Sequence, residues 1–157
     1  MSDRERAQWA RALTTAGWLV LTGYLLLVVA QLRRALSIRS SPFEDGVWGQ
    51  RAEVVSLVAQ PQNLVILAIA SVAAVVANVL TRHGDLVPVA WAPQLVRVVA
   101  GTSYLAVALG AVGIIDHFVQ TPDSVGGTFP LLNRVAGILM AVAMIRVCLE
   151  SERASAG

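Results

Sequence analysis

The residues best suited to chemistry in this chain are an aspartate, a histidine and an arginine beside long apolar runs. Asp116 and His117 are adjacent at the end of one such run, and Arg134 lies just inside the next. Glu53, in the segment before another run, could reach the same side of a membrane. Ionisable side chains near membrane depth are candidates for proton transfer, ion passage or ligand binding. We therefore treat these four residues as candidates for a ligand or proton pathway.

The sequence lacks the short motifs of common enzymes and cofactor sites. It contains no glycine-rich phosphate loop, no HExxH pair and no GxSxG elbow. The single cysteine, Cys148, excludes an intrachain disulfide, a Cys-x-x-Cys redox centre and a thiolate metal cage. His83 and His117 end successive antiparallel runs, on opposite membrane sides, so they could not share a haem iron. A metal held by Asp116 and His117 would need further ligands, so we expect no enzyme, no cofactor and no metal site.

The composition indicates a membrane protein. Only 14% of the 157 residues are charged, whereas a soluble domain carries about 25%, and the mean hydropathy is +0.66. The net charge of +2 is spread along the chain, which argues against a nucleic-acid partner, because such partners require clustered cations. All 12 basic residues are arginine, and with the abundant alanine, valine and glycine this suggests a GC-rich bacterial genome.

Four apolar runs are long enough to cross a hydrocarbon core of roughly 30 Å as helices. They cover about residues 12–32, 62–80, 95–118 and 131–149. The first run follows a basic head, as a signal peptide would, but it is long and no A-x-A site follows, so we expect it to be retained. The chain is thus predicted to be an all-α membrane protein, a single domain over residues 1–157 with four transmembrane helices in two antiparallel hairpins.

The segment of residues 46–60, between the first two runs, is amphipathic. Ser41, Pro42 and Glu44 precede it as a helix-start signal. Its polar residues gather on one side of a helix and most of its valines on the other, so the segment could lie in the headgroup plane. Pro61 favours a break directly after it. We predict an interfacial amphipathic helix; the alternative is that the segment extends the second span along a tilted path.

A stripe of small residues runs along the third span, which we call the packing face. Its members recur at spacings of three and four, on one side of a helix: Ser103, Ala106, Gly110 and Gly113. Small side chains let a second helix approach closely, and close approach is what favours helix association in a membrane. We predict that the packing face meets the second or fourth span, or a partner subunit.

Charge placement leads to two further predictions. Asp116 ends the third span and Arg134 lies one turn inside the fourth, so the two side chains would share one membrane face and form an ion pair. Arginines are more frequent on the side that holds both termini, and the loop of residues 120–130 has none. By the positive-inside rule, both termini should lie in the cytoplasm.

These observations leave two main classes of function. The first is a small multi-pass protein of the bacterial plasma membrane, surrounded by the lipid bilayer, that acts as a scaffold or accessory subunit and contacts itself or other membrane subunits. The second is an oligomeric transporter or channel-like protein, or a lipid- or quinone-binding protein, with a polar vestibule at Asp116, His117 and Arg134. An enzyme acting on lipid is disfavoured, because no nucleophile–base motif is present.

Overall fold

The structure, a computed structural model, describes residues 2–38, 47–82, 91–120 and 128–156, and every element in these ranges is a helix. The elements are α1 (Asp3–Ser37), α2 (Val47–Ser56), the short 3₁₀ helix η1 (Leu57–Ala59), α3 (Pro61–Arg82), α4 (Trp91–Gln120) and α5 (Thr128–Ala156). The helix-start signal at Ser41 and the histidine at position 83 lie outside the described residues.

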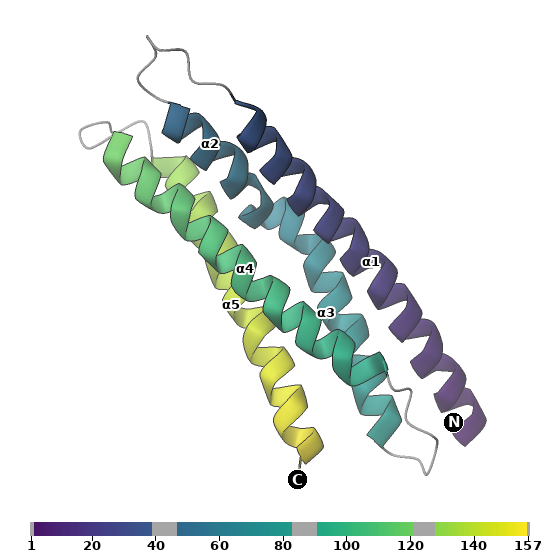
Figure 1. The fold of residues 1–157 in the computed structure, drawn as a ribbon. Coiled ribbons are helices and arrows are strands. Elements are labelled where there is room, and N and C mark those ends of the chain that lie inside the picture. The colour runs from purple at the N-terminus through teal and green to yellow at the C-terminus, as the bar shows by residue number, and fades with distance from the viewer. Residues whose placement is uncertain (1, 39–46, 83–90, 121–127, 157) are drawn as a thin grey trace.

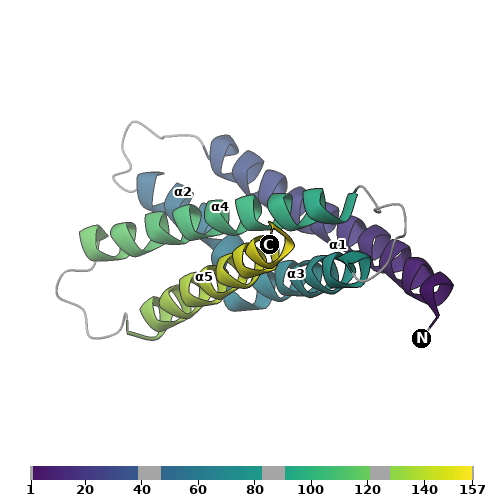
Figure 2. The same ribbon diagram turned by 90° about the horizontal axis from the view of Figure 1, so that it is seen from below.

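The helices lie side by side as an elongated bundle (Figure 1). α1 runs from one end of the bundle to the other, α2 and α3 return together, and α4 and α5 repeat this course, so both termini lie at the same end. α1 packs mainly on α3, and α4 packs mainly on α5. The N-terminal part of α1 stands apart from α5 both in this view and from below (Figure 2).

Four helical stretches in the described part of the chain are long and apolar enough to cross a membrane. They are Asp3–Ser37, Val47–Thr81, Trp91–Val119 and Pro130–Ala154. These helices are longer than the predicted apolar runs, because polar residues on either side of each run also adopt helical structure. At the start of α1, for example, Ser2 and Glu5 form a capping box, with N···O distances of 2.7 and 3.3 Å.

Apolar side chains fill the interior and also cover much of the outside. Leu21 and Tyr24 of α1 are completely buried, as are Leu64 and Leu67 of α3. Large apolar residues are nevertheless exposed on every long helix, among them Leu19, Ile69, Val72, Ile115 and Leu139. Water-soluble monomers rarely expose continuous apolar surface on this scale. The length of the helices and the character of their surface indicate a membrane protein.

The segment predicted as an interfacial helix packs along the bundle. α2 contacts α1 and α4 and leads through η1 into α3, so that Val47–Thr81 is a single candidate span. Its small residues Gly49, Ala52 and Ser56 are buried, whereas Trp48 is exposed. The most deeply buried residues of α2 are thus its small ones, while Val47, Val54 and Val55 are half-buried. This arrangement favours the alternative prediction, in which the segment extends the second span.

Candidate functional site

Three segments of the chain come into close contact through residues with little or no side chain. We call this contact the small-residue junction; it consists of Ser56 in α2, Ala59 in η1, Gly110 and Gly113 in α4, and Gly137 in α5. A Cβ added to Gly113 would lie 2.5 Å from the Cβ of Ser56, and one added to Gly110 would lie 3.1 Å from the Cβ of Ala59. A Cβ on Gly137 would collide with the carbonyl oxygen of Ala59. A Cβ does not fit at Gly113 or Gly137 without a shift of the neighbouring segment, and at Gly110 it would require its neighbours to move by a few tenths of an ångström.

Two residues of the packing face predicted along the third span, Gly110 and Gly113, belong to this junction. The four residues of the packing face are all buried: Ser103, Ala106, Gly110 and Gly113. Gly110 lies against Ala59 on one side and against Ile138 of α5 on the other, where a Cβ would be 3.0 Å from Ile138 Cγ1. The part of the second span that touches Gly110 is η1, in the segment that we had expected at the membrane surface.

The four residues predicted for a ligand or proton pathway are brought together only in part. Asp116 is buried on α4, with 5% of its surface exposed, one turn beyond Gly113. His117 is half-buried, and its ring meets the ring of Phe118 edge-on at a centroid distance of 6.0 Å. Glu53 is exposed on α2, and its backbone carbonyl accepts a 2.8 Å hydrogen bond from the hydroxyl of Ser56.

The predicted ion pair between Asp116 and Arg134 is not formed, which corrects our expectation. Arg134 is half-buried at the edge of the junction, and its Nη1 donates a hydrogen bond to the carbonyl oxygen of Gly113. Because Gly113 has no side chain, its carbonyl is open to a guanidinium group from the neighbouring helix. Arg134 therefore links α5 to the backbone of α4, a structural contact that its place in the sequence did not reveal.

The second span is interrupted just beside the junction. Gln60 has an extended backbone, with φ of −71° and ψ of 145°, between η1 and α3. Pro61 has no backbone N–H, so it cannot donate to the carbonyl of Leu57 as another residue would in a continuous helix. The side-chain amide of Asn63 donates to that carbonyl instead, at 2.7 Å. The carbonyl of Leu57 thus loses its usual helical donor, and it accepts instead from the backbone N–H of Gln60 at 3.2 Å and from the Asn63 amide.

A tyrosine from the first span satisfies the next carbonyl of the interruption. The hydroxyl of Tyr24 donates to the carbonyl oxygen of Val58 at 2.9 Å, and Tyr24 is completely buried. Tyr24 lies eight residues before Leu32, the end of the first apolar run, a distance of roughly 12 Å at 1.5 Å per helical residue. Non-helical backbone at such depth is tolerated where protein groups satisfy it. The sequence predicted the break at Pro61 but not the contacts of Tyr24 and Asn63. The available signal was the carbonyl four residues before the proline, which loses its helical donor.

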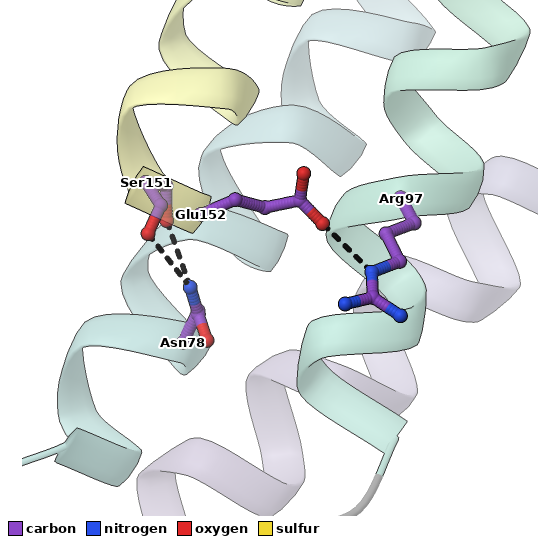
Figure 3. Close-up of polar contacts among 4 residues, drawn as sticks. All are labelled: Asn78, Arg97, Ser151 and Glu152. Atoms are coloured by element: carbon purple, nitrogen blue, oxygen red, sulfur yellow. Dashed lines mark hydrogen bonds and ion pairs between the residues drawn. The ribbon is translucent and has the colours of Figure 1, made fainter. Parts of the chain in front are cut away.

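The terminal end of the bundle is held by longer side chains, as Figure 3 shows. Asn78 of α3 donates from Nδ2 to the hydroxyl oxygen of Ser151 in α5 at 2.8 Å, and both residues are buried. Beside them, Arg97 of α4 and Glu152 of α5 form an ion pair at 2.8 Å. The Arg97 side chain is 74% exposed, so we expect solvent or headgroups to weaken this pair.

Two hollows lie along α1, away from the predicted vestibule. One, of about 420 Å³, is an apolar groove between Leu13 and the outer side of α3. The other, of about 370 Å³, lies between α1 and the start of α4. Its lining residues are Arg11, Thr14, Thr15, Trp18 and Trp91. Within the described residues, no three histidine, cysteine or acidic side chains are grouped so that they could hold a metal ion.

Comparisons with protein-family models, with curated proteins and with known structures give no match for this chain. Its function must therefore be inferred from its own residues and their contacts.

Proposed function

We propose that this chain is a small multi-pass protein of the bacterial plasma membrane that acts as a scaffold or accessory subunit of a membrane complex. Its four helical stretches would cross the bilayer as two antiparallel hairpins. The observation that carries the proposal is that polar side chains inside the bundle donate hydrogen bonds to backbone carbonyls. Tyr24, Asn63 and Arg134 each donate to a backbone carbonyl and so hold helical segments together. Side chains employed in this way support a rigid structural role.

The placement of arginines supports an orientation with both termini in the cytoplasm. Arg4, Arg11 and Arg153 are exposed near the terminal end of the bundle. At the opposite end, Arg51 donates to the carbonyl of Ile38 at 2.8 Å, and Arg134 is engaged at the junction. Arg33 and Arg34 also lie toward that end, but among the described residues the arginines are more numerous at the terminal end, which supports this orientation by the positive-inside rule.

A second candidate is an oligomeric transporter or channel-like protein, or a lipid- or quinone-binding protein, with a vestibule at Asp116, His117 and Arg134. The burial of Asp116 in a helix long enough to span a membrane favours it, because buried carboxyl groups at such sites often take part in ion or proton movement. Against it, Arg134 is engaged with the backbone of Gly113, so we rank this candidate second.

Mass measurement of the native assembly separates the two candidates. The full chain would be isolated from its own membranes in a mild detergent or in lipid nanodiscs, and its mass determined by native mass spectrometry. A stoichiometric complex with another membrane protein is the expected result for a scaffold or accessory subunit. A closed homo-oligomer that retains a bound small molecule would contradict it and support the second candidate.

A further inference from the structure

We propose that the hollow between α1 and the start of α4 binds the phosphate-bearing headgroup of an anionic phospholipid, with Arg11 as its cationic partner. We call this hollow the headgroup pocket; its lining residues are Arg11, Thr14, Thr15, Trp18 and Trp91. The proposal rests on the membrane insertion proposed above, but not on the role of the chain as a subunit of a complex.

The chemistry of the lining suits a phospholipid headgroup. The guanidinium of arginine offers several N–H donors in a plane, which match the oxygens of a phosphate. Tryptophan is favoured at the level of the headgroups, where one part of the indole is in apolar and the other in polar surroundings. Thr14 and Thr15 donate to the carbonyls of Ala10 and Arg11 at 2.7 and 2.9 Å. Their oxygens can still accept a hydrogen bond from a headgroup hydroxyl.

The guanidinium of Arg11 is not engaged by the described part of the chain, unlike those of Arg97 and Arg134. Arg97 pairs with Glu152, and Arg134 donates to the carbonyl of Gly113. In the part of the chain that the structure describes, the guanidinium of Arg11 makes no hydrogen bond or ion pair, and the residue is exposed. Its positive charge is therefore available to an anion in the pocket.

The pocket also lies at the depth where headgroups are expected. Arg11 directly precedes the first apolar run, and Trp18 lies roughly 10 Å further along α1, at 1.5 Å per residue. Arg4, Arg11 and Trp18 follow one another at intervals of seven, so a second exposed arginine lies on the same helix face, outside the apolar run. A lipid could place its phosphate at Arg11 and its chains toward Trp18. The predicted cytoplasmic position of the termini would place the pocket in the leaflet that is rich in anionic lipid.

Lipid retention by the purified full chain tests the proposal. Native mass spectrometry in detergent would compare added phosphatidylglycerol with phosphatidylcholine. We expect phosphatidylglycerol to bind about tenfold more tightly, and Arg11→Gln to lower its affinity by about tenfold, as for loss of a charge-assisted hydrogen bond. Arg33→Gln is the matched control, because Arg33 is exposed near the other end of the same helix; it should leave the affinity unchanged.

A tryptophan variant keeps the test decisive if Arg11→Gln folds poorly. Trp91 is 66% exposed, so Trp91→Ala should preserve the fold and weaken phosphatidylglycerol binding by about threefold. Trp48→Ala, at a residue 65% exposed elsewhere, is its control. Equal retention by the wild-type chain, Arg11→Gln and Trp91→Ala would overturn the proposal. Displacement of the lipid by millimolar inorganic phosphate would also overturn it, in favour of a site for free phosphate. Failure to isolate a complex with another membrane protein would contradict the proposed function, but it would not change the outcome of these lipid-binding measurements.

Discussion

The two ends of the bundle hold their helices together in different ways. Toward the end opposite the termini, the small-residue junction brings helices close together: Gly137 faces the backbone carbonyl of Ala59, and Gly113 faces the small side chain of Ser56. At the terminal end, Asn78 reaches Ser151, and the exposed Arg97 reaches Glu152. Backbone contact tolerates almost no change in shape, whereas long side chains can adjust. The comparison therefore predicts that substitutions at the junction cost far more stability than substitutions at the terminal end.

The largest effect is expected for Gly137→Ala. The added methyl group would collide with the carbonyl oxygen of Ala59, so α5 must move away from η1. We expect a loss of about 3 kcal/mol in the free energy of unfolding, at the upper end of the range for overpacking. Thermal unfolding of the full chain in one detergent measures it. Gly101→Ala is the control, because an added Cβ there meets nothing within 4 Å; equal stability of the two variants would refute the close contact.

Gly110→Leu should have the next largest effect. The new side chain would enter the space held by Ala59 and Ile138 and force α4 away from both. The expected loss is about 2 kcal/mol, again by overpacking. The same substitution at Gly23, where nothing lies within 4 Å, serves as control and should be nearly neutral. If Gly110→Leu leaves the isolated chain stable but dissociates a complex, the packing face meets a partner rather than this chain.

Tyr24→Phe tests the interruption of the second span with a smaller change. It removes the donor to the carbonyl of Val58 and keeps the ring in the core. A buried carbonyl without a partner should lower the free energy of unfolding by about 1–2 kcal/mol. Hydrogen exchange of the amides around the interruption should also become faster. Tyr104→Phe, at a tyrosine 54% exposed, is the matched control; an effect as large as that of Tyr24→Phe would contradict the assignment.

Arg97→Gln should have the smallest effect of the four. Its ion pair with Glu152 joins an exposed and a half-buried side chain, and exposed pairs contribute about 0.2–1 kcal/mol. We expect a loss of less than about 0.5 kcal/mol, which diminishes further at high salt. A double-mutant cycle with Glu152→Gln measures the pair itself. A coupling free energy between Arg97 and Glu152 as large as the loss of stability in Gly137→Ala would contradict the predicted difference in stability between the two ends.

Features that repeat along a helix could be predicted from the sequence, and contacts between distant segments could not. The small residues of the packing face lie at helical spacing, and Pro61 marks the interruption by its missing N–H. The hydroxyl of Tyr24, by contrast, bonds to a carbonyl 34 residues away, and no local pattern encodes that meeting.

The misjudged features have related physical causes. For residues 46–60, the amphipathic pattern predicts a helix in the headgroup plane. Small residues permit close packing of helices, and Gly49 and Ala52 of α2 are buried against the bundle. For Asp116 and Arg134, a shared end of the bundle was taken to mean contact. The guanidinium reaches the carbonyl of Gly113, one turn away from Asp116, because a glycine leaves that carbonyl open.

Cysteine labelling in intact cells tests most directly the central claim, that the chain crosses the membrane with both termini in the cytoplasm. In a Cys148→Ser background, single cysteines would replace Ser124, between α4 and α5, or Ser155, near the C-terminus. A membrane-impermeant maleimide should label the cysteine at position 124 in intact cells, and the one at position 155 only after lysis. The reverse pattern would contradict the orientation. Labelling of both positions in intact cells, or of neither, would contradict a crossing by α5.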